Sequence, residues 1–254
     1  MEIIPAIYIL NGHCVSLYKG SYQQKETYFK SPLEYARHFE REGAQKLYVI
    51  DLDGRLKGDF PQMNLVERMI KSVKIPVQVE ADFTSIAAIE KAFAIGASKV
   101  VLRPSAKQII REAIEKFGPE KVIVEMNAKG SEVVQPIVTK TINGKLEIEP
   151  DLSQNHEVVD FAEMLVTLGV KEIIYKDERS EGTLIHPNYD DVDRIFATIG
   201  AIEGQFGIKI YVSGGIGQIK HLQTLKKIGI AGAIINKAFF ESMITIKEAE
   251  KAVG

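Results

Sequence analysis

Short apolar runs rich in β-branched residues recur along the chain and alternate with stretches of helical periodicity. The runs that we expect to be strands are residues 3–9, 46–52, 77–81, 99–102, 121–126, 172–176, 209–213 and 233–236. Runs that are apolar at nearly every position are typical of parallel strands buried on both faces. Strands and helices that alternate in one even series predict a parallel α/β fold.

The chain length makes this prediction more specific. The 254 residues divide into eight units of about 32 residues, a suitable length for the strand–helix pairs of a (βα)8 TIM barrel. Helix starts carry the expected signals, as in Ser31-Pro32-Leu33-Glu34, where a capping residue precedes a first-turn proline and an acid. Because no Pro/Ser-rich linker divides the chain, we expect a single barrel domain over residues 1–254.

One stretch interrupts the alternation. Residues 133–149 contain strand-like residues on both sides of Asn143-Gly144, the strongest short signal for a tight hairpin turn. We therefore expect a β-hairpin excursion at about residues 131–150, after the fifth strand.

Matches between the two halves of the sequence suggest an internal repeat. The segment that starts at Val77 aligns with the one that starts at Ile210, 133 residues later. Strand two matches strand six, and strand one matches strand five, at similar offsets. Offsets near half the chain length predict two (βα)4 half-barrel repeats.

Composition excludes several classes of protein. A chain that is 45% hydrophobic with a net charge of −2 is neither disordered nor basic enough for a dedicated nucleic-acid binder. No apolar run approaches the length that spans a membrane. The one cysteine, Cys14, cannot form an internal disulfide, which indicates a reducing cytoplasm, and we expect its thiol to be buried and inert. We expect a monomer or small homo-oligomer that binds a small metabolite, with no nucleic acid or membrane partner.

The sequence gives no sign of a metal or cofactor. The five histidines lack metal-ligand spacing, and we expect surface or turn positions for them: His13, His38, His156, His186 and His221. From the loop after the sixth strand, His186 could reach a ligand. The glycines at 214, 215 and 217 do not form a dinucleotide fingerprint, because residue 220 is lysine. We therefore expect no metal and no cofactor.

Several motifs are spread over the whole chain: Pro5-Ala6-Ile7, Val49 to Gly54, Ile75 to Val79, Gly182-Thr183-Leu184, Ser213-Gly214-Gly215-Ile216, and Lys237-Ala238-Phe239 before Ile244-Thr245. These motifs resemble those of the HisA/HisF family of histidine-biosynthesis barrels, and of HisA more closely. The resemblance runs nearly end to end. It implies a half-barrel duplication and a substrate with two phosphates, one held by each half. It also implies opening of an aminoribose ring and isomerisation to an aminoketose, an Amadori rearrangement.

The resemblance also implies catalytic positions, and there the chain departs from the family. Tyr8 and Asn127 stand where the family has aspartates at the ends of strands one and five, and Lys176 stands where it has threonine. Glu181 keeps a carboxyl group before Gly-Thr. Asparagine cannot titrate, and tyrosine is a poor base near neutral pH. The candidate catalytic residues are therefore Glu181 and Lys176, with Tyr8 and Asn127 beside them.

The phosphate positions differ between the two halves. In the second half, Gly214 and Gly215 allow backbone N–H groups to approach an anion near a helix N-terminus, although a tight strand-to-helix turn would also require glycine. The candidate phosphate-binding residues are Ser213, Gly214, Gly215, Asn236, Lys237, Gly182 and Thr183. In the first half, Glu80 and Asp82 would repel a phosphate, and Arg103 either clamps an anion or pairs with one of these acids. We expect one phosphate site.

Two further groups of side chains allow two interpretations. Lys176 could form a Schiff base with a carbonyl substrate, or it could be a salt-bridged charge whose acidic neighbours raise its pKa. Asp51, Asp53 and Asp177 stand at strand ends, where acids serve catalysis or cap the following turn.

Three hypotheses for function follow. The first is a divergent HisA-type phosphoribosyl isomerase. The second is a relative that uses Lys176 on a singly phosphorylated carbonyl compound. The third is a non-catalytic protein that binds a phosphorylated ligand.

Overall fold

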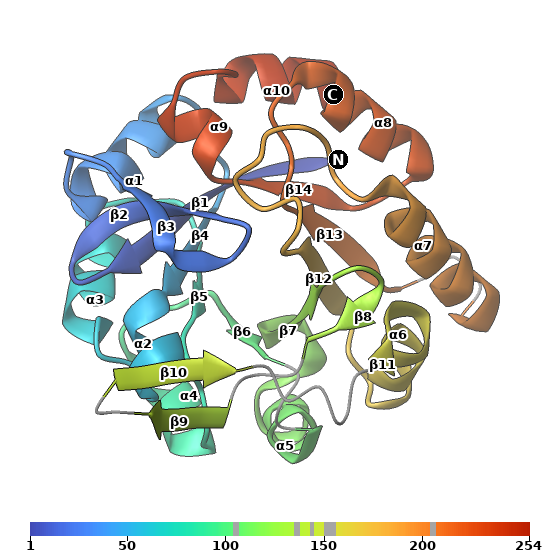
Figure 1. The fold of residues 1–254 in the computed structure, drawn as a ribbon, viewed down its shortest axis with the longest axis horizontal. Coiled ribbons are helices and arrows are strands. Elements are labelled where there is room, and N and C mark those ends of the chain that lie inside the picture. Colours follow the sequence, from blue (N-terminus) through green and yellow to red (C-terminus); the bar gives the residue numbers. More distant parts are fainter. Residues whose placement is uncertain (104–106, 135–137, 143–144, 150–155, 204–206) are drawn as a thin grey trace.

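The strands and helices form a closed barrel (Figure 1). A computed structural model describes residues 1–103, 107–134, 138–142, 145–149, 156–203 and 207–254. The barrel strands, in chain order, are β1 (Glu2–Leu10), β4 (Leu47–Asp51), β5 (Val77–Glu80), β6 (Lys99–Leu102), β7 (Val122–Ala128), β12 (Glu172–Asp177), β13 (Lys209–Ser213) and β14 (Gly232–Ile235). Each pairs in parallel with its neighbours, and β14 pairs with β1 to close the ring. The predicted (βα)8 TIM barrel is confirmed, while its origin as two half-barrel repeats stays a prediction.

Helices surround the strands on the outside (Figure 1). They are α1 (Pro32–Arg41), α2 (Leu52–Lys57), α3 (Met63–Lys71), α4 (Ile86–Ala94), α5 (Lys107–Phe117), α6 (Val158–Thr167), α7 (Tyr189–Glu203), α8 (Ile219–Ile228), α9 (Lys237–Phe240) and α10 (Ile246–Val253), with a 3-10 turn at η1 (Pro119–Lys121). Ser31 caps α1 and exchanges hydrogen bonds with Glu34, as its sequence signal predicted. Of the helices in the described ranges, none is long and apolar enough to cross a membrane.

Side chains alternate along each strand between two apolar cores. Residues such as Ile4, Ala6 and Tyr8 face the barrel interior, whereas Ile3 and Ile7 pack against the surrounding helices. This alternation follows from the pleat of a β-strand, which turns successive side chains to opposite faces. Both faces are apolar, so the strands look continuously hydrophobic in sequence.

A hairpin that the sequence analysis missed follows the first barrel strand. Strand β2 (His13–Tyr18) pairs with β1 and with β3 (Ser21–Thr27), which is largely exposed. Lys19 and Gly20 both have positive φ angles, of 51° and 72°. Positive φ at both central residues is what a two-residue type I′ turn requires. The signal was weak because β3 is polar and lysine is an uncommon residue at the first turn position.

A second excursion follows β7. Strands β9 (Val138–Ile142) and β10 (Lys145–Glu149) pair in antiparallel fashion within the stretch that the sequence assigns to a hairpin. Its turn, at residues 143–144, lies outside the described residues. Two short strands, β8 (Glu132–Val133) and β11 (His156–Glu157), pair at the base of the excursion.

Candidate active site

A small pocket opens at the carboxyl ends of the barrel strands, between β14, β13 and the loop after β12. Its polar lining residues are Tyr8, Glu181, Ser213, Asn236 and Lys237, and its glycines are Gly182, Gly214 and Gly215. This is the end of the barrel at which TIM-barrel enzymes carry their active sites. The structure thus brings together most of the predicted phosphate-binding residues and the predicted Glu181.

The β13–α8 turn borders this pocket and contains backbone donors without an acceptor among the described residues. Gly214 and Gly215 have φ angles of 96° and 75°, a region that favours glycine. Within the described part of the chain, the N–H groups of Gly215 and Ile216 have no hydrogen-bond acceptor, although both residues line the pocket. Unpaired N–H groups beside the N-terminus of α8 are suited to bind an anion.

The same turn also packs against the β12–α7 loop. A Cβ atom on Gly215 would overlap the carbonyl of His186, and one on Gly214 would lie 2.9 Å from the carbonyl oxygen of Asp177. The glycines are therefore needed for close packing as well as for backbone conformation. These glycines therefore fit the structural interpretation and the phosphate-binding interpretation at the same time.

His221 corrects the expectation that the histidines are surface or turn residues. Its side chain is only 2% exposed, and its Nδ1 accepts a hydrogen bond of 3.2 Å from the N–H of Gly217. Burial lowers the pKa of His221, and the nearby Lys220 and His186 lower it further. A neutral His221 therefore anchors the end of the glycine turn to the first turn of α8. His186, by contrast, is exposed and contacts the carbonyl of Pro187.

Asn236 and Lys237 hold the β14 side of the pocket. The Asn236 amide donates to the carbonyl of Ala6 at 3.0 Å and accepts from the hydroxyl of Ser16. The ammonium of Lys237 lies 3.0 Å from Glu26 and 3.5 Å from Glu241, and these acids raise its pKa against the opposing effect of burial. Ser16 and Glu26 both belong to the hairpin that follows β1, so this hairpin braces the pocket.

Gly182 and Thr183 form the loop that closes the pocket from the β12 side. Gly182 has a φ angle of 68°, and a Cβ atom there would overlap the carbonyl of Leu17. The hydroxyl of Thr183 donates to the carbonyl of Ser180 at 2.7 Å. Both residues therefore shape the loop that carries Glu181.

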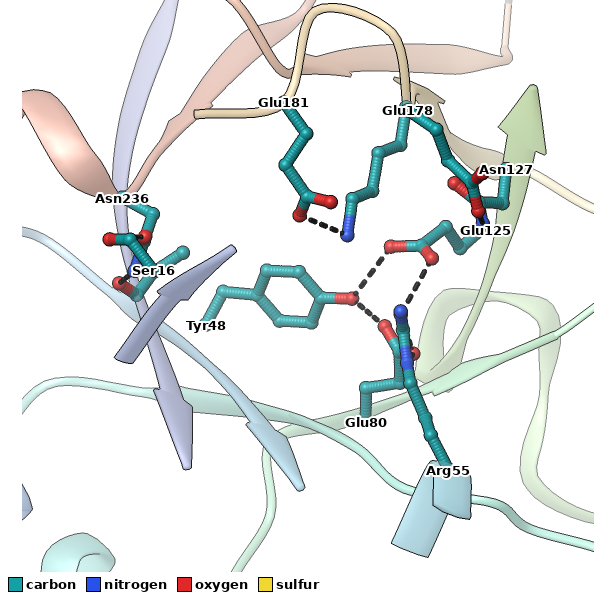
Figure 2. A network of polar contacts seen from close by, with 11 residues as sticks. Ser16, Tyr48, Arg55, Glu80, Glu125, Asn127, Glu178, Glu181 and Asn236 are labelled. Carbon is teal, nitrogen blue, oxygen red and sulfur yellow. Dashed lines mark hydrogen bonds and ion pairs between the residues drawn. The ribbon is translucent and has the colours of Figure 1, made fainter. Parts of the chain in front are cut away.

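Lys176 and Glu181 form a buried ion pair beside the pocket (Figure 2). The Lys176 ammonium lies 2.6 Å from Glu181 Oε1 and 5.0 Å from the centre of the Tyr8 ring. Burial alone would lower the pKa of Lys176, but the charges of Glu181, Tyr8 and Glu125 outweigh it and raise the pKa. Of its two interpretations, the geometry therefore favours the salt-bridged charge. Burial raises the pKa of Tyr8, so its phenol is protonated at neutral pH.

A second ionic network fills the other side of the barrel mouth (Figure 2). Arg55 reaches from α2 to Glu80 at the end of β5 and lies 2.7 Å from Glu125 on β7. Tyr48 donates to Glu80 as well. Arg55 and Lys176 hold the pKa of Glu125 below its usual range despite burial, whereas burial raises the pKa of Glu80 despite Arg55.

Sequence reasoning missed Arg55, Glu125 and Tyr48. A signal was present for Glu125, because it interrupts an apolar strand at a position two residues from Ile123, which faces the barrel interior. Arg55 gave no such signal, since it lies on a helix and only the tertiary fold turns it inward.

Arg103 pairs with Asp82, which corresponds to the second of its two interpretations. Its guanidinium lies 3.9 Å from Asp82. A carboxylate at that distance neutralises the positive charge that a phosphate would need. Burial, with Arg55 nearby, lowers the pKa of Arg103. The first-half end of the mouth is thus built from internally paired charges.

Asn127 does not line the pocket but stands next to Lys176 on the neighbouring strand. Its amide donates a hydrogen bond to Glu178, a residue that the sequence analysis did not select. Burial raises the pKa of Glu178, while Lys176 opposes this effect. The structure therefore adds a second glutamate, from the same loop as Glu181, to the candidate site.

The remaining candidates have structural roles. Asp51 caps α2 through the N–H of Gly54, and Asp177 accepts from the N–H of Arg179. Asp53 accepts from the N–H of Asn11. Cys14 is buried as expected, and burial raises the pKa of its thiol to about 12. These groups stabilise turns and the core, and the thiol is protonated at neutral pH.

Comparisons with known proteins found similar sequences along nearly the whole chain. The family model described as "Histidine biosynthesis protein" matches residues 2–245. A relative from Alkaliphilus metalliredigens (strain QYMF) is 33% identical over 249 residues, 97% of each chain. A relative from Roseiflexus castenholzii (strain DSM 13941 / HLO8) is 33% identical over 252 residues, 98% of each chain. Both bear the name 1-(5-phosphoribosyl)-5-((5-phosphoribosylamino)methylideneamino) imidazole-4-carboxamide isomerase.

Proposed function

The chain belongs to the histidine biosynthesis protein family, and on that premise we propose that it binds a phosphorylated sugar or ribonucleotide in the pocket beside β13 and β14. The observation that carries the proposal is the pair of unpaired N–H groups at Gly215 and Ile216, two residues that line the pocket. Backbone donors at a helix N-terminus bind phosphate oxygens with little rearrangement. The phosphate would lie against this turn, and the rest of the ligand would extend toward Glu181.

The ligand carries one phosphate. At the opposite end of the mouth, Arg55 is shared by Glu80 and Glu125, and Arg103 is paired with Asp82. A second phosphate would have to displace carboxylates from both arginines, and the acids would repel it. We therefore expect ribulose 5-phosphate to bind at least about tenfold more tightly than ribulose 1,5-bisphosphate, a difference of about 1.4 kcal/mol.

For the reaction, the proposal is an aldose–ketose isomerisation of the kind that the relatives' name indicates. Glu181 is the carboxylate at the pocket, so it accepts and returns the proton on carbon. The Lys176 ammonium, 2.6 Å from Glu181, stabilises negative charge on the neighbouring oxygen. Tyr8 titrates too far from neutral pH and lines the pocket, where it positions the ligand. Asn127 does not titrate and takes no part in the proton transfer.

A second candidate is a non-catalytic protein that binds the same ligand. The observation in its favour is that Lys176 and Glu181 already neutralise each other within the protein. A Schiff base at Lys176 has less support, because the raised pKa keeps the amine protonated. The expected site of action is the cytoplasm, where the single buried thiol stays reduced, and the expected assembly is a monomer or small homo-oligomer.

Two measurements test the proposal. Calorimetric titration with inorganic phosphate and with ribulose 5-phosphate tests the pocket. If neither compound binds, the proposal is overturned. Incubation with the relatives' formimino-aminoribonucleotide substrate, together with rescue of a histidine auxotroph, tests the reaction. Turnover that disappears in Glu181→Gln supports the isomerase and, because this substrate carries two phosphoribosyl groups, would overturn the claim of a single phosphate. Ligand binding without turnover or rescue supports the binding protein.

A further inference from the structure

The carbonyl oxygen of the Asn127 side chain lacks a partner at the mouth of the barrel. Asn127 is only 8% exposed, and its Oδ1 accepts no hydrogen bond within the described part of the chain. Its amide nitrogen is already used, because it donates to Glu178 Oε1. An unsatisfied buried acceptor costs free energy unless a ligand or water supplies a donor.

Glu178 lies beside this acceptor and is also incompletely neutralised. It is half-buried, and no cation of the described residues lies within ion-pair distance of it. Burial raises its pKa, and Lys176 and Lys129 oppose this rise from beyond ion-pair distance. Lys176 is held by Glu181 at 2.6 Å. Figure 2 shows Asn127 and Glu178 together at one side of the network, away from the Arg55 guanidinium.

The charges around these two groups favour a cation. The acids Glu80, Glu125, Glu178 and Glu181 meet inside the mouth with the cations Arg55 and Lys176, and Arg103 lies nearby, paired with Asp82. Among the residues that the structure describes, Glu178 alone of these acids has no cation within ion-pair distance, so a positively charged group beside it is stabilised and a negatively charged one is destabilised. An ammonium has three donors and no acceptor, which matches a carboxylate and a free amide oxygen.

The register of the strands sets how far Asn127 lies from Ser213, the residue that precedes the phosphate turn. Asn127 pairs with Lys176 across β7 and β12, and Lys176 pairs with Ser213 across β12 and β13. Two strand spacings amount to about 10 Å. A hexose phosphate, with a hydrogen bond of about 3 Å at each end, spans that distance.

We propose that Asn127 Oδ1 and the Glu178 carboxylate form a second ligand subsite that binds an ammonium group, so that the ligand is an amino-sugar phosphate with one phosphate. This inference rests on the proposed phosphate pocket and names the class of its ligand. Gly20 of the β2–β3 turn packs against Glu178 and limits the subsite on its outer side.

The test compares glucosamine 6-phosphate with glucose 6-phosphate by calorimetric titration at pH 7, since the two differ by one ammonium group. The wild type should bind glucosamine 6-phosphate at least tenfold more tightly. In Glu178→Gln and in Asn127→Ala the ratio of the two affinities should fall below threefold. Glu163→Gln, which removes an exposed charge on α6, is the matched control and should keep the wild-type ratio.

The outcomes of these titrations separate the ammonium subsite from the phosphate pocket. A ratio near one in the wild type, or a high ratio that persists in Glu178→Gln, overturns the subsite. Inorganic phosphate is titrated in parallel: if it binds while the ratio is near one, the phosphate pocket stands and the subsite falls. If neither phosphate nor either sugar phosphate binds, both proposals fail.

Discussion

Lys176 Nζ lies 2.6 Å from Glu181 Oε1, and the two side chains are only 2% and 6% exposed. Lysine comes from the end of β12 and glutamate from the loop that follows it, so the pair links a barrel strand to the loop that borders the pocket. A charge in this environment is stable only while its partner is present, because neither can be solvated by bulk water. The ion pair thus affects both the position of the loop that borders the pocket and the charge beside the pocket.

Removal of the lysine should therefore destabilise the protein strongly. Lys176→Met leaves the Glu181 carboxylate buried without a cation, and we expect a loss of about 3–5 kcal/mol in the free energy of unfolding, measured in urea. The double variant Lys176→Met/Glu181→Leu should recover most of that loss. Lys71→Met, which removes an exposed pair with Glu67, should cost less than about 1 kcal/mol. A loss below about 1 kcal/mol in Lys176→Met would contradict the prediction.

The same ion pair predicts the outcome of a trapping experiment. Since acidic neighbours raise the pKa of Lys176, its amine is protonated and is not a nucleophile at neutral pH. Borohydride reduction in the presence of ribulose 5-phosphate should leave the mass of the protein unchanged. A reduced adduct in the wild type that is missing from Lys176→Met would show that the lysine forms a Schiff base.

His221 should make stability depend on pH in the weakly acidic range. Its pKa is lowered in the folded protein, so below about pH 6.5 His221 binds a proton more readily in the unfolded chain than in the folded chain. The free energy of unfolding should fall as pH drops from 6.5 to 5, by at most about 1.4 kcal/mol per pH unit. His221→Asn keeps an acceptor for Gly217 without titrating, and should flatten this dependence. His13→Asn, at an exposed position, should retain the wild-type slope.

Gly215 should be sensitive to the smallest side chain. Its positive φ and the overlap of a Cβ atom with the His186 carbonyl mean that Gly215→Ala must shift the turn. We expect inorganic phosphate to bind at least about tenfold more weakly, as measured by calorimetry, and the unfolding midpoint to drop. Gly200→Ala is the control, because this helical glycine of α7 has open space around it, and the change should stabilise by about 0.5–1 kcal/mol. Unchanged phosphate affinity in Gly215→Ala would count against the binding turn.

Parts of the site were predictable because they depend on local conformation. The β13–α8 turn was recognisable from Gly214 and Gly215, since a left-handed backbone at a strand end restricts the residue type. Arg55 could not be predicted to contact Glu80 and Glu125, because they lie 25 and 70 residues away in sequence. His221 was misjudged for a related reason: α8 has a polar sequence around it, and only packing against the turn buries the ring.

The sequence by itself determined the eight barrel strands, because burial on both faces demands continuous apolar runs that are visible without any partner. It also determined the resemblance to a family and the substitutions at Tyr8, Asn127, Lys176 and Glu181. Tertiary structure alone decided which charges neutralise each other. Closure of the barrel brings Arg55 to Glu80 and Glu125 and leaves Lys176 with Glu181, and in that low-dielectric interior the pairing of each charge depends on distance. Asn127 and Glu178 illustrate this, since their contact exists only because β7 and β12 are neighbours in the barrel.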